Sequence, residues 1–322
     1  MRLIALLLVF GCSSAAPPGP EPARAFYYWR TTFALSAAER AALTGVTRLY
    51  VRMFDVGADG ELLGKLAAGT PVPQGLEVVP VVFLKNDVFK HPPPGLARTV
   101  RAEVAARMQA LGAVAHELQI DCDWTEGTRE AYFAFLAELH GAVPLSATIR
   151  LHQVKYRERT GVPPVERGML MFYNMGKFSA DPTMRAIFDE ASARKYLGRI
   201  AEYPLPLDAA LPIWSWVVHL RDDRVIGLLE STDPDELAAL DFATRSAPDR
   251  YTVTRAAFLH GTLLRDGDLL KIEVTAQADT LAAAGMLGPH LAPIARTVAL
   301  FDLSERNLGR HGNLDQAFRA LR

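Results

Sequence analysis

Two aspartates separated by one residue, Asp121 and Asp123, lie in a mostly apolar run over residues 117–124. If this run is a strand, both carboxylates point the same way, because strand side chains alternate between two faces. Two carboxylates held close together do not both ionise at their usual pKa, so the pair is a candidate acid/base device. The alternative is a structural network of hydrogen bonds. A helix-like stretch at 129–140 follows, which places the acids at a strand-to-helix turn.

The rest of the chain predicts a fold that would position these acids. From Ala25 onward, short β-branched or aromatic runs alternate with helical segments, which favours a parallel sheet with crossover helices. Strand candidates lie at residues 26–29, 48–54, 76–84, 118–123, 145–151, 168–173, 211–218 and 297–303. The clearest helices lie at residues 36–43, 96–111, 129–140 and 192–201. Eight such units predict an α/β fold, a (β/α)8 barrel of the TIM type over residues 25–322.

An open doubly wound sheet is the main alternative fold. Against it, no Gly-rich phosphate loop follows an early strand, and eight strands exceed what the common open folds use. The stretch over residues 230–291 fits the barrel least well. Residues 268–274 favour an extra strand there, and we expect the rest to be a helical insertion or irregular region before the last strand.

The composition and the N-terminus restrict the function classes. The chain has 322 residues, half of them apolar, and a net charge of -1, which offers no field to attract nucleic acid. Residues 1–12 join a positive charge, a short apolar run and Cys12, and resemble a bacterial lipoprotein signal with an acylated cysteine. Proline-rich residues 13–24 predict a flexible linker. We expect an exported protein held at an envelope membrane by a lipid anchor alone; a plain secretory signal is the alternative.

Polar side chains gather at the predicted carboxyl ends of the strands, where barrel enzymes place their chemistry. Besides the acid pair they include Arg52, Lys85, Glu126, Arg150, His152, Tyr173, Asn174 and His219. If the cations among them converge, they would suit an anionic glycan. The alternative is that they pair with nearby acids such as Asp55.

The four tryptophans also fall at predicted strand ends. A pyranose packs its apolar face on an aromatic ring, so Trp29, Trp124, Trp214 and Trp216 are candidates for sugar binding. Trp214 and Trp216 share one strand face if residues 211–218 form a single strand. The alternative for each tryptophan is that it fills the core as a large hydrophobe.

Two motifs carry a resemblance to a known family. Asp121-x-Asp123, and Met171-Phe172-Tyr173-Asn174 on the sixth predicted strand, resemble the paired motifs of chitinase-like, family-eighteen glycoside hydrolases. The resemblance implies a TIM barrel that cleaves a polysaccharide, with Tyr173 beside the acids. In that family the substrate's own acetamido group is the nucleophile. The chain also resembles a group of exported bacterial proteins of unknown function, which supplies no activity.

The chain departs from the family pattern at two positions. The family's general acid follows the last Asp by two residues, but Thr125 stands there and Glu126 comes one residue late. Three interpretations follow: the strand end bends so that Glu126 donates the proton, Asp123 donates it, or the protein binds sugar without cleaving it. Glu126 also suits the first turn of the next helix, where the dipole favours an acid. Asn174 replaces the family's Asp.

We therefore predict a glycoside hydrolase that acts on an envelope or extracellular polysaccharide through carboxylate acid/base catalysis. The alternative is a non-catalytic glycan-binding or envelope-assembly lipoprotein of the same fold. We expect no cofactor and no metal, because the histidines lack the spacing of a metal site. Cys122 alternates to the face opposite Asp121 and is expected to be a buried hydrophobe.

Overall fold

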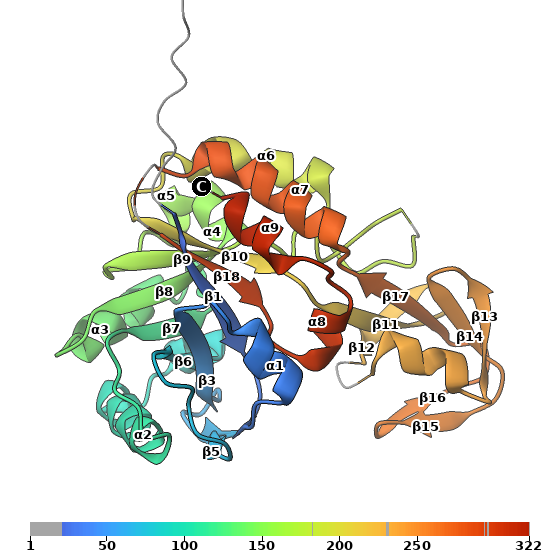
Figure 1. Cartoon of the computed structure of the whole chain (residues 1–322), viewed down its shortest axis with the longest axis horizontal. Coiled ribbons are helices and arrows are strands. Elements are labelled where there is room, and N and C mark those ends of the chain that lie inside the picture. Colours follow the sequence, from blue (N-terminus) through green and yellow to red (C-terminus); the bar gives the residue numbers. More distant parts are fainter. Residues whose placement is uncertain (1–20, 182, 230–231, 293, 295, 322) are drawn as a thin grey trace, which may run out of the picture.

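The computed structural model describes residues 21–181, 183–229, 232–292, 294 and 296–321. Eight parallel strands close into a barrel, because β1 pairs with both β3 and β18 (Figure 1). The strands are β1 (Ala23–Tyr28), β3 (Arg48–Val56), β6 (Glu77–Leu84), β7 (Leu118–Cys122), β8 (Leu145–Arg150), β9 (Arg167–Met171), β10 (Leu207–Pro212) and β18 (Thr297–Phe301). The predicted (β/α)8 barrel is confirmed. The predicted signal and most of the predicted linker, residues 1–20, lie outside the described residues.

Helices pack around the outside of the barrel (Figure 1). They are α1 (Ala37–Ala42), α2 (Leu96–Ala110), α3 (Arg129–Leu139), α4 (Leu151–Lys155), α5 (Arg157–Thr160), α6 (Glu190–Ile200), α7 (Gln277–Leu287), α8 (Glu305–Gly309) and α9 (Leu314–Arg319), with the 3-10 turns η1 (Asn86–Lys90) and η3 (Gly288–His290). The four predicted helices correspond to α1, α2, α3 and α6. Ser36 starts α1 with a capping box, in which its hydroxyl accepts from the Glu39 N–H and the Glu39 carboxylate accepts from the Ser36 N–H. Within the described residues, no helix is both long and apolar enough to cross a membrane.

The barrel strands bury both faces. One face packs on the helices, with Phe26, Val51 and Ile120 among its buried residues. The other face fills the barrel interior, where Tyr50 and Val81 are fully buried. This two-sided burial explains why the strands are apolar along most of their length. Because side chains fill the interior, the positions open to chemistry lie at the carboxyl ends of the strands.

Three short strands lie beside the barrel strands near this end. They are β2 (Thr32–Phe33), β4 (Leu62–Leu63) and β5 (Ala67–Ala68). β4 pairs antiparallel with the end of β3, and β2 pairs with β5. These pairings order the loops that follow the first two barrel strands.

An insertion between β10 and α7 forms a second, antiparallel sheet, at the right of Figure 1. Its strand order is β12-β11-β17-β14-β13. The elements are β11 (Ser215–Arg221), β12 (Arg224–Leu228), η2 (Pro234–Ala239), β13 (Ala243–Ala247), β14 (Arg250–Val253), β17 (Leu269–Val274) and the hairpin of β15 (Ala257–Leu259) and β16 (Thr262–Leu264). The predicted extra strand at residues 268–274 is β17. The expectation that the rest of the insertion is helical is wrong, because strands dominate it.

The predicted strand over residues 211–218 is also wrong as a single element. β10 ends at Pro212, and β11 begins at Ser215 in the other sheet. Proline has no N–H to continue a strand ladder, which fits the end of β10 at this residue. Both strands are apolar, so the pattern alone did not separate them.

Candidate functional site

The ends of β7 and β8 place both predicted aspartates on one guanidinium. Asp121 is 4% exposed, whereas Asp123, one residue beyond β7, is exposed. Arg150 donates from Nη2 to Asp121 Oδ1 at 3.1 Å and from Nε to Asp123 Oδ1. Thr148 Oγ1 donates to Asp121 Oδ1 at 2.6 Å. The structure therefore brings Asp121, Asp123 and Arg150 together as one ion cluster, which we call the acid cluster.

Burial and charge act in opposite directions within the acid cluster. Burial raises the pKa of Asp121, and the positive charge of Arg150 offsets part of that rise. Burial lowers the pKa of Arg150, but the charges of Asp121 and Asp123 outweigh it and leave that pKa raised. Arg150 is therefore a permanent positive charge between the two carboxylates.

Tyr173 lies beside the acid cluster, just beyond the end of β9. It is 5% exposed, and its hydroxyl lies 3.0 Å from Met171 Sδ. Burial raises the pKa of this phenol, and Arg150 partly opposes the rise. Tyr173 is thus a neutral hydroxyl that can donate a hydrogen bond. The next residue, Asn174, is exposed with a φ of 55°, a conformation that asparagine tolerates better than most residues.

Half-buried aromatic rings continue from Tyr173 across the ends of β10, β18 and β1. The Trp214 ring meets Tyr173 edge-to-face with the centroids 4.7 Å apart, and lies 5.3 Å from Phe301. Trp29 lies 5.6 Å from Phe301 on the other side. Trp214 and Trp216 do not share a strand, since Trp214 lies between β10 and β11, but their rings are 6.0 Å apart. The two indoles therefore lie next to each other as predicted, but not because they share a strand face.

Glu126 makes its contacts away from the acid cluster. Its carboxylate forms an ion pair with Arg159 at 2.7 Å, and both side chains are exposed. Glu126 and Arg159 line a separate cavity of about 260 Å³ together with His152 and Tyr156. Among the described residues, no hydrogen bond or ion pair joins Glu126 to Asp121 or Asp123. His152 is closer to the acid cluster, because the charge of Asp123 opposes the lowering of the His152 pKa by burial.

Several of the predicted cations are engaged by acids. Arg52 forms a two-pronged ion pair with Asp55, at 2.8 and 2.7 Å, and donates to the Gly64 carbonyl. His219 lies buried in the insertion sheet, where it bonds Asp268 at 2.6 Å. Lys85 is exposed, and no ion pair of its side chain is seen among the described residues. The expectation of several unpaired cations at one mouth is therefore wrong for Arg52, Arg150 and His219.

Trp124 corrects another prediction. Its side chain is fully buried in the core between the barrel and the helices, stacked on Tyr132 with the ring centroids 5.1 Å apart. Its indole N–H donates to the Thr160 carbonyl at 2.8 Å. A sugar therefore has no access to this ring, and the alternative of a core hydrophobe describes Trp124.

Replacing Trp124 by Phe is expected to lower the free energy of unfolding by about 2 kcal/mol. The Thr160 carbonyl loses its donor, and the smaller ring leaves a gap beside Tyr132. Urea denaturation followed by circular dichroism measures this loss. Affinity for oligosaccharides should stay unchanged, and a variant of normal stability with weakened affinity would contradict this placement.

The remaining predicted features concern Cys122 and metal binding. Cys122 is buried, and burial raises the pKa of its thiol, so it is an inert apolar side chain as expected. Among the described residues, no group of three or more His, Cys, Asp or Glu side chains could hold a metal ion.

Sequence reasoning missed two aromatic residues near the strand ends, Phe301 and Phe178. Phe301 ends β18 and contacts Tyr27, Trp29, Tyr173 and Trp214. Phe178, in the loop after β9, packs on Trp216. Asp302 follows Phe301, and burial raises its pKa to about 6. The position of Phe301 at a barrel strand end was available as a signal, and the same rule does single out Asp302, whereas the position of Phe178 in a long loop gave no signal.

Comparisons with known proteins support the fold. No protein-family model and no curated protein sequence matches the chain. Among solved structures, the spore cortex-lytic enzyme SleL of Bacillus cereus is 13% identical over 94% of this chain and 74% of its own, with a TM-score of 0.55. A mutant GH18 chitinase of Cycas revoluta in complex with (GlcNAc)4 is 9% identical over 92% of this chain and 98% of its own, with a TM-score of 0.54. The chitinase-like agglutinin of Robinia pseudoacacia is 11% identical over 92% and 99%, with a TM-score of 0.50. At these identities the likeness shows the fold alone, a (β/α)8 barrel.

Proposed function

We propose that this protein binds an oligosaccharide across the mouth of the barrel and hydrolyses it as a glycoside hydrolase, with Asp123 as the carboxylate that reaches the glycosidic bond. The observation that carries the proposal is the acid cluster: Arg150 holds the exposed Asp123 and the buried Asp121 together, beside Tyr173. The location of the cluster at the carboxyl ends of β7 and β8 supports the proposal, because barrel enzymes carry out their chemistry at this end.

The aromatic rings supply a surface for the sugar. Trp29, Trp214, Trp216 and Phe301 are each half-buried, so each ring is held by packing and still presents an accessible part. The apolar face of a pyranose can pack on such a ring while its hydroxyls stay free to hydrogen-bond. Because Trp214 contacts Tyr173, a sugar on Trp214 would lie next to the acid cluster.

Cleavage requires a proton for the leaving oxygen and stabilisation of the positive charge that develops on the sugar carbon. Of the three predicted carboxylates, Asp123 alone is both exposed and part of the acid cluster. Protonated Asp123 would give its proton to the glycosidic oxygen as the carbon–oxygen bond breaks. Asp121 would then face the developing charge, and the Tyr173 hydroxyl would hydrogen-bond a polar group of the substrate. Water would add to the sugar carbon and return a proton to the Asp123 carboxylate, which completes the hydrolysis.

A second candidate function is glycan binding without cleavage. It is favoured by the place of the residues that follow Asp123. Thr125 occupies the position of the family's general acid, and Glu126 is engaged by Arg159. Arg150 also occupies an oxygen of the Asp123 carboxylate through its ion pair. Measuring product release and binding for the same oligosaccharides separates the two candidates, since a binding protein has no turnover.

The charge at the mouth bears on the class of glycan. Arg52 and Arg150 are each engaged by carboxylates, and Asp123 is exposed. We therefore propose a neutral oligosaccharide as the ligand, because the mouth offers little unpaired positive charge to an acidic one.

Binding should accordingly be several-fold tighter for neutral oligosaccharides than for acidic ones of equal length. Isothermal titration calorimetry with neutral chito-oligosaccharides and uronic-acid oligosaccharides provides the comparison. Added salt should narrow the difference, because it screens the repulsion from exposed Asp123. Tighter binding of the acidic series at low salt would contradict the proposal and would favour an anionic glycan as the ligand.

The proposed site of action is outside the cytoplasm, at an envelope or extracellular polysaccharide. This part of the proposal rests on residues 1–12 of the sequence, in which Cys12 would carry the lipid anchor. It is independent of the arrangement at the barrel mouth.

A further inference from the structure

The insertion sheet has two faces with different partners. One face, including Val217 and Leu270, packs into the insertion's own core. The opposite face carries Lys271 and Glu273 on β17, which are only 1% and 5% exposed. Charged side chains are almost never buried to this degree unless they are paired. The partners of this pair therefore indicate what this face of the sheet holds in place.

Lys271 binds the chain segment between β9 and α6. Its ammonium group lies 2.6 Å from the Met184 carbonyl, 3.1 Å from the Asp181 carbonyl and 3.3 Å from the Ser179 carbonyl. It also forms an ion pair with Glu273 Oε1 at 3.1 Å. A lysine ammonium has three donors, so these acceptors satisfy it completely. We call residues 175–181 and 183–188 the bridging segment, because they lie between β9 and α6 of the barrel and contact the insertion sheet.

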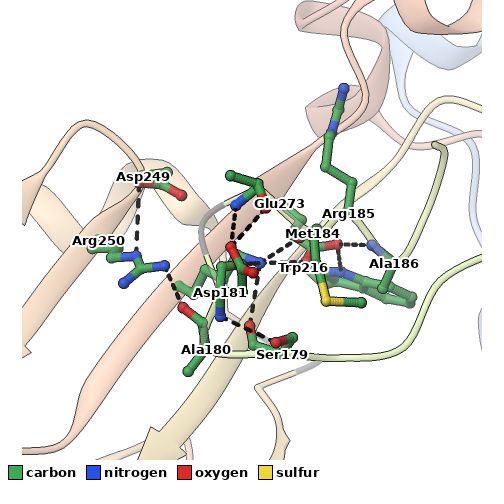
Figure 2. Close-up of polar contacts among 12 residues, drawn as sticks. Ser179, Ala180, Asp181, Met184, Arg185, Ala186, Trp216, Asp249, Arg250 and Glu273 are labelled. Carbon is green, nitrogen blue, oxygen red and sulfur yellow. Dashed lines mark hydrogen bonds and ion pairs between the residues drawn. The ribbon is translucent and has the colours of Figure 1, made fainter. Parts of the chain in front are cut away.

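Glu273 joins the bridging segment to a tryptophan of the candidate site. Its Oε2 accepts from the Ala186 N–H at 2.8 Å and from the Trp216 indole N–H at 3.2 Å (Figure 2). Trp216 lies directly opposite Glu273 in the pairing of β11 with β17. Figure 2 also shows Arg250 reaching the Ala180 carbonyl of the bridging segment. One carboxylate thus fixes both the indole and the segment that passes it.

The bridging segment also contributes an aromatic ring, Phe178, that contacts Trp216. Phe178 packs edge-to-face on Trp216, with the ring centroids 4.9 Å apart and an interplanar angle of 65°. Phe178 is 37% exposed and Trp216 is half-buried, so both rings are accessible. Trp216 contacts Trp214, and Trp214 contacts Tyr173. The rings form a continuous row that leads from the acid cluster out to the insertion.

We infer that Glu273, held by Lys271, is a positioning residue that fixes Trp216 and Phe178 as the outer wall of the oligosaccharide site. This inference rests on the proposed function, and it extends that function to the length of the ligand. A short oligosaccharide at Trp214 does not reach the outer wall, whereas a longer one packs on it. Glu273 therefore determines the gain in affinity that comes with chain length, without touching the ligand itself.

The test compares (GlcNAc)2 and (GlcNAc)4 as probes by calorimetry. The double variant Lys271→Met with Glu273→Leu removes the Glu273 contact. The double variant replaces a buried ion pair by apolar side chains of similar volume, a change that often leaves stability unaltered. Val253→Ala is the matched control, because Val253 is fully buried in the insertion core and lies apart from this contact.

The double variant should bind (GlcNAc)4 about tenfold more weakly, equivalent to about 1.4 kcal/mol, and (GlcNAc)2 as well as before. Val253→Ala should bind both as the unaltered protein does. The inference is overturned if the double variant keeps the full gain from (GlcNAc)2 to (GlcNAc)4, since the pair is then purely structural.

Tryptophan fluorescence gives a reading that needs no glycan. The double variant should show red-shifted emission and stronger acrylamide quenching than Val253→Ala, and both changes should vanish in a Trp216→Phe background. If the unaltered protein binds no oligosaccharide, the proposed function fails and the fluorescence alone decides the positioning role. Unchanged emission in the double variant would refute that role whatever the binding result.

Discussion

Asp123→Asn should lose oligosaccharide hydrolysis by at least about 100-fold, the lower range for removal of a general acid. Asparagine has nearly the same shape as aspartate and its carbonyl can still accept from Arg150, so the site should keep its structure. Binding of the oligosaccharide should therefore stay within a few-fold of the unaltered protein. Product release measured by mass spectrometry and affinity measured by calorimetry on the same samples test both parts.

Glu126→Gln is the matched control for this experiment. Glu126 is an exposed carboxylate like Asp123, but it contacts Arg159 and not Arg150. This variant should hydrolyse the substrate as fast as the unaltered protein does. The reverse pattern, with turnover lost in Glu126→Gln and kept in Asp123→Asn, would assign proton donation to Glu126. Binding without turnover in every sample would establish the second candidate function.

The acid cluster was predictable because it depends on two local rules. Side-chain alternation along β7 places Asp121 and Asp123 on the same face, and the carboxyl ends of parallel strands meet at one end of a barrel. These rules also brought Arg150 and Tyr173 to the same place. The rules do not say which charges pair, so the binding of both aspartates by Arg150 required the structure.

The end of β7 explains the place of Glu126. The strand ends at Cys122, so the alternation that pairs Asp121 with Asp123 does not extend to Glu126, and Thr125 lines the same separate cavity as Glu126. Thr125 then enters a turn in which its N–H donates to Thr128 Oγ1 at 3.0 Å. The chain is already leaving the strand at Glu126, which accordingly meets Arg159 on the neighbouring loop.

The insertion was much less predictable than the barrel. β11 pairs with β17, which lies at the far end of the insertion in the sequence. A local sequence pattern does not predict a pairing between strands so far apart. Lys271 and Glu273 could not be predicted as buried either. Lysine and glutamate are usually exposed, and these two are buried because their charged groups are paired. The outer wall of Trp216 and Phe178 therefore depends on tertiary contacts that the sequence does not reveal.

Arg150→Met should lower the free energy of unfolding by about 3 kcal/mol near neutral pH, because it leaves Asp121 buried without its charge partner. The loss should depend on pH. Burial already raises the pKa of Asp121 in the folded protein, and removing Arg150 removes the charge that offsets this rise. An acid with a raised folded-state pKa destabilises the fold as pH rises from its unfolded value, about 3.9, through the folded value.

The stability difference between Arg150→Met and the unaltered protein should therefore shrink toward pH 4 and widen toward pH 7. Denaturant titrations across this range measure it. Adding Asp121→Asn to Arg150→Met should restore much of the stability and flatten the pH dependence, because the neutral amide no longer needs a buried cation. If the single variant were as stable as the unaltered protein at pH 7, Arg150 would not be the residue that compensates the charge of Asp121. The acid cluster would then owe its geometry to packing alone, and the argument that Arg150 preorganises Asp123 would lose its physical basis.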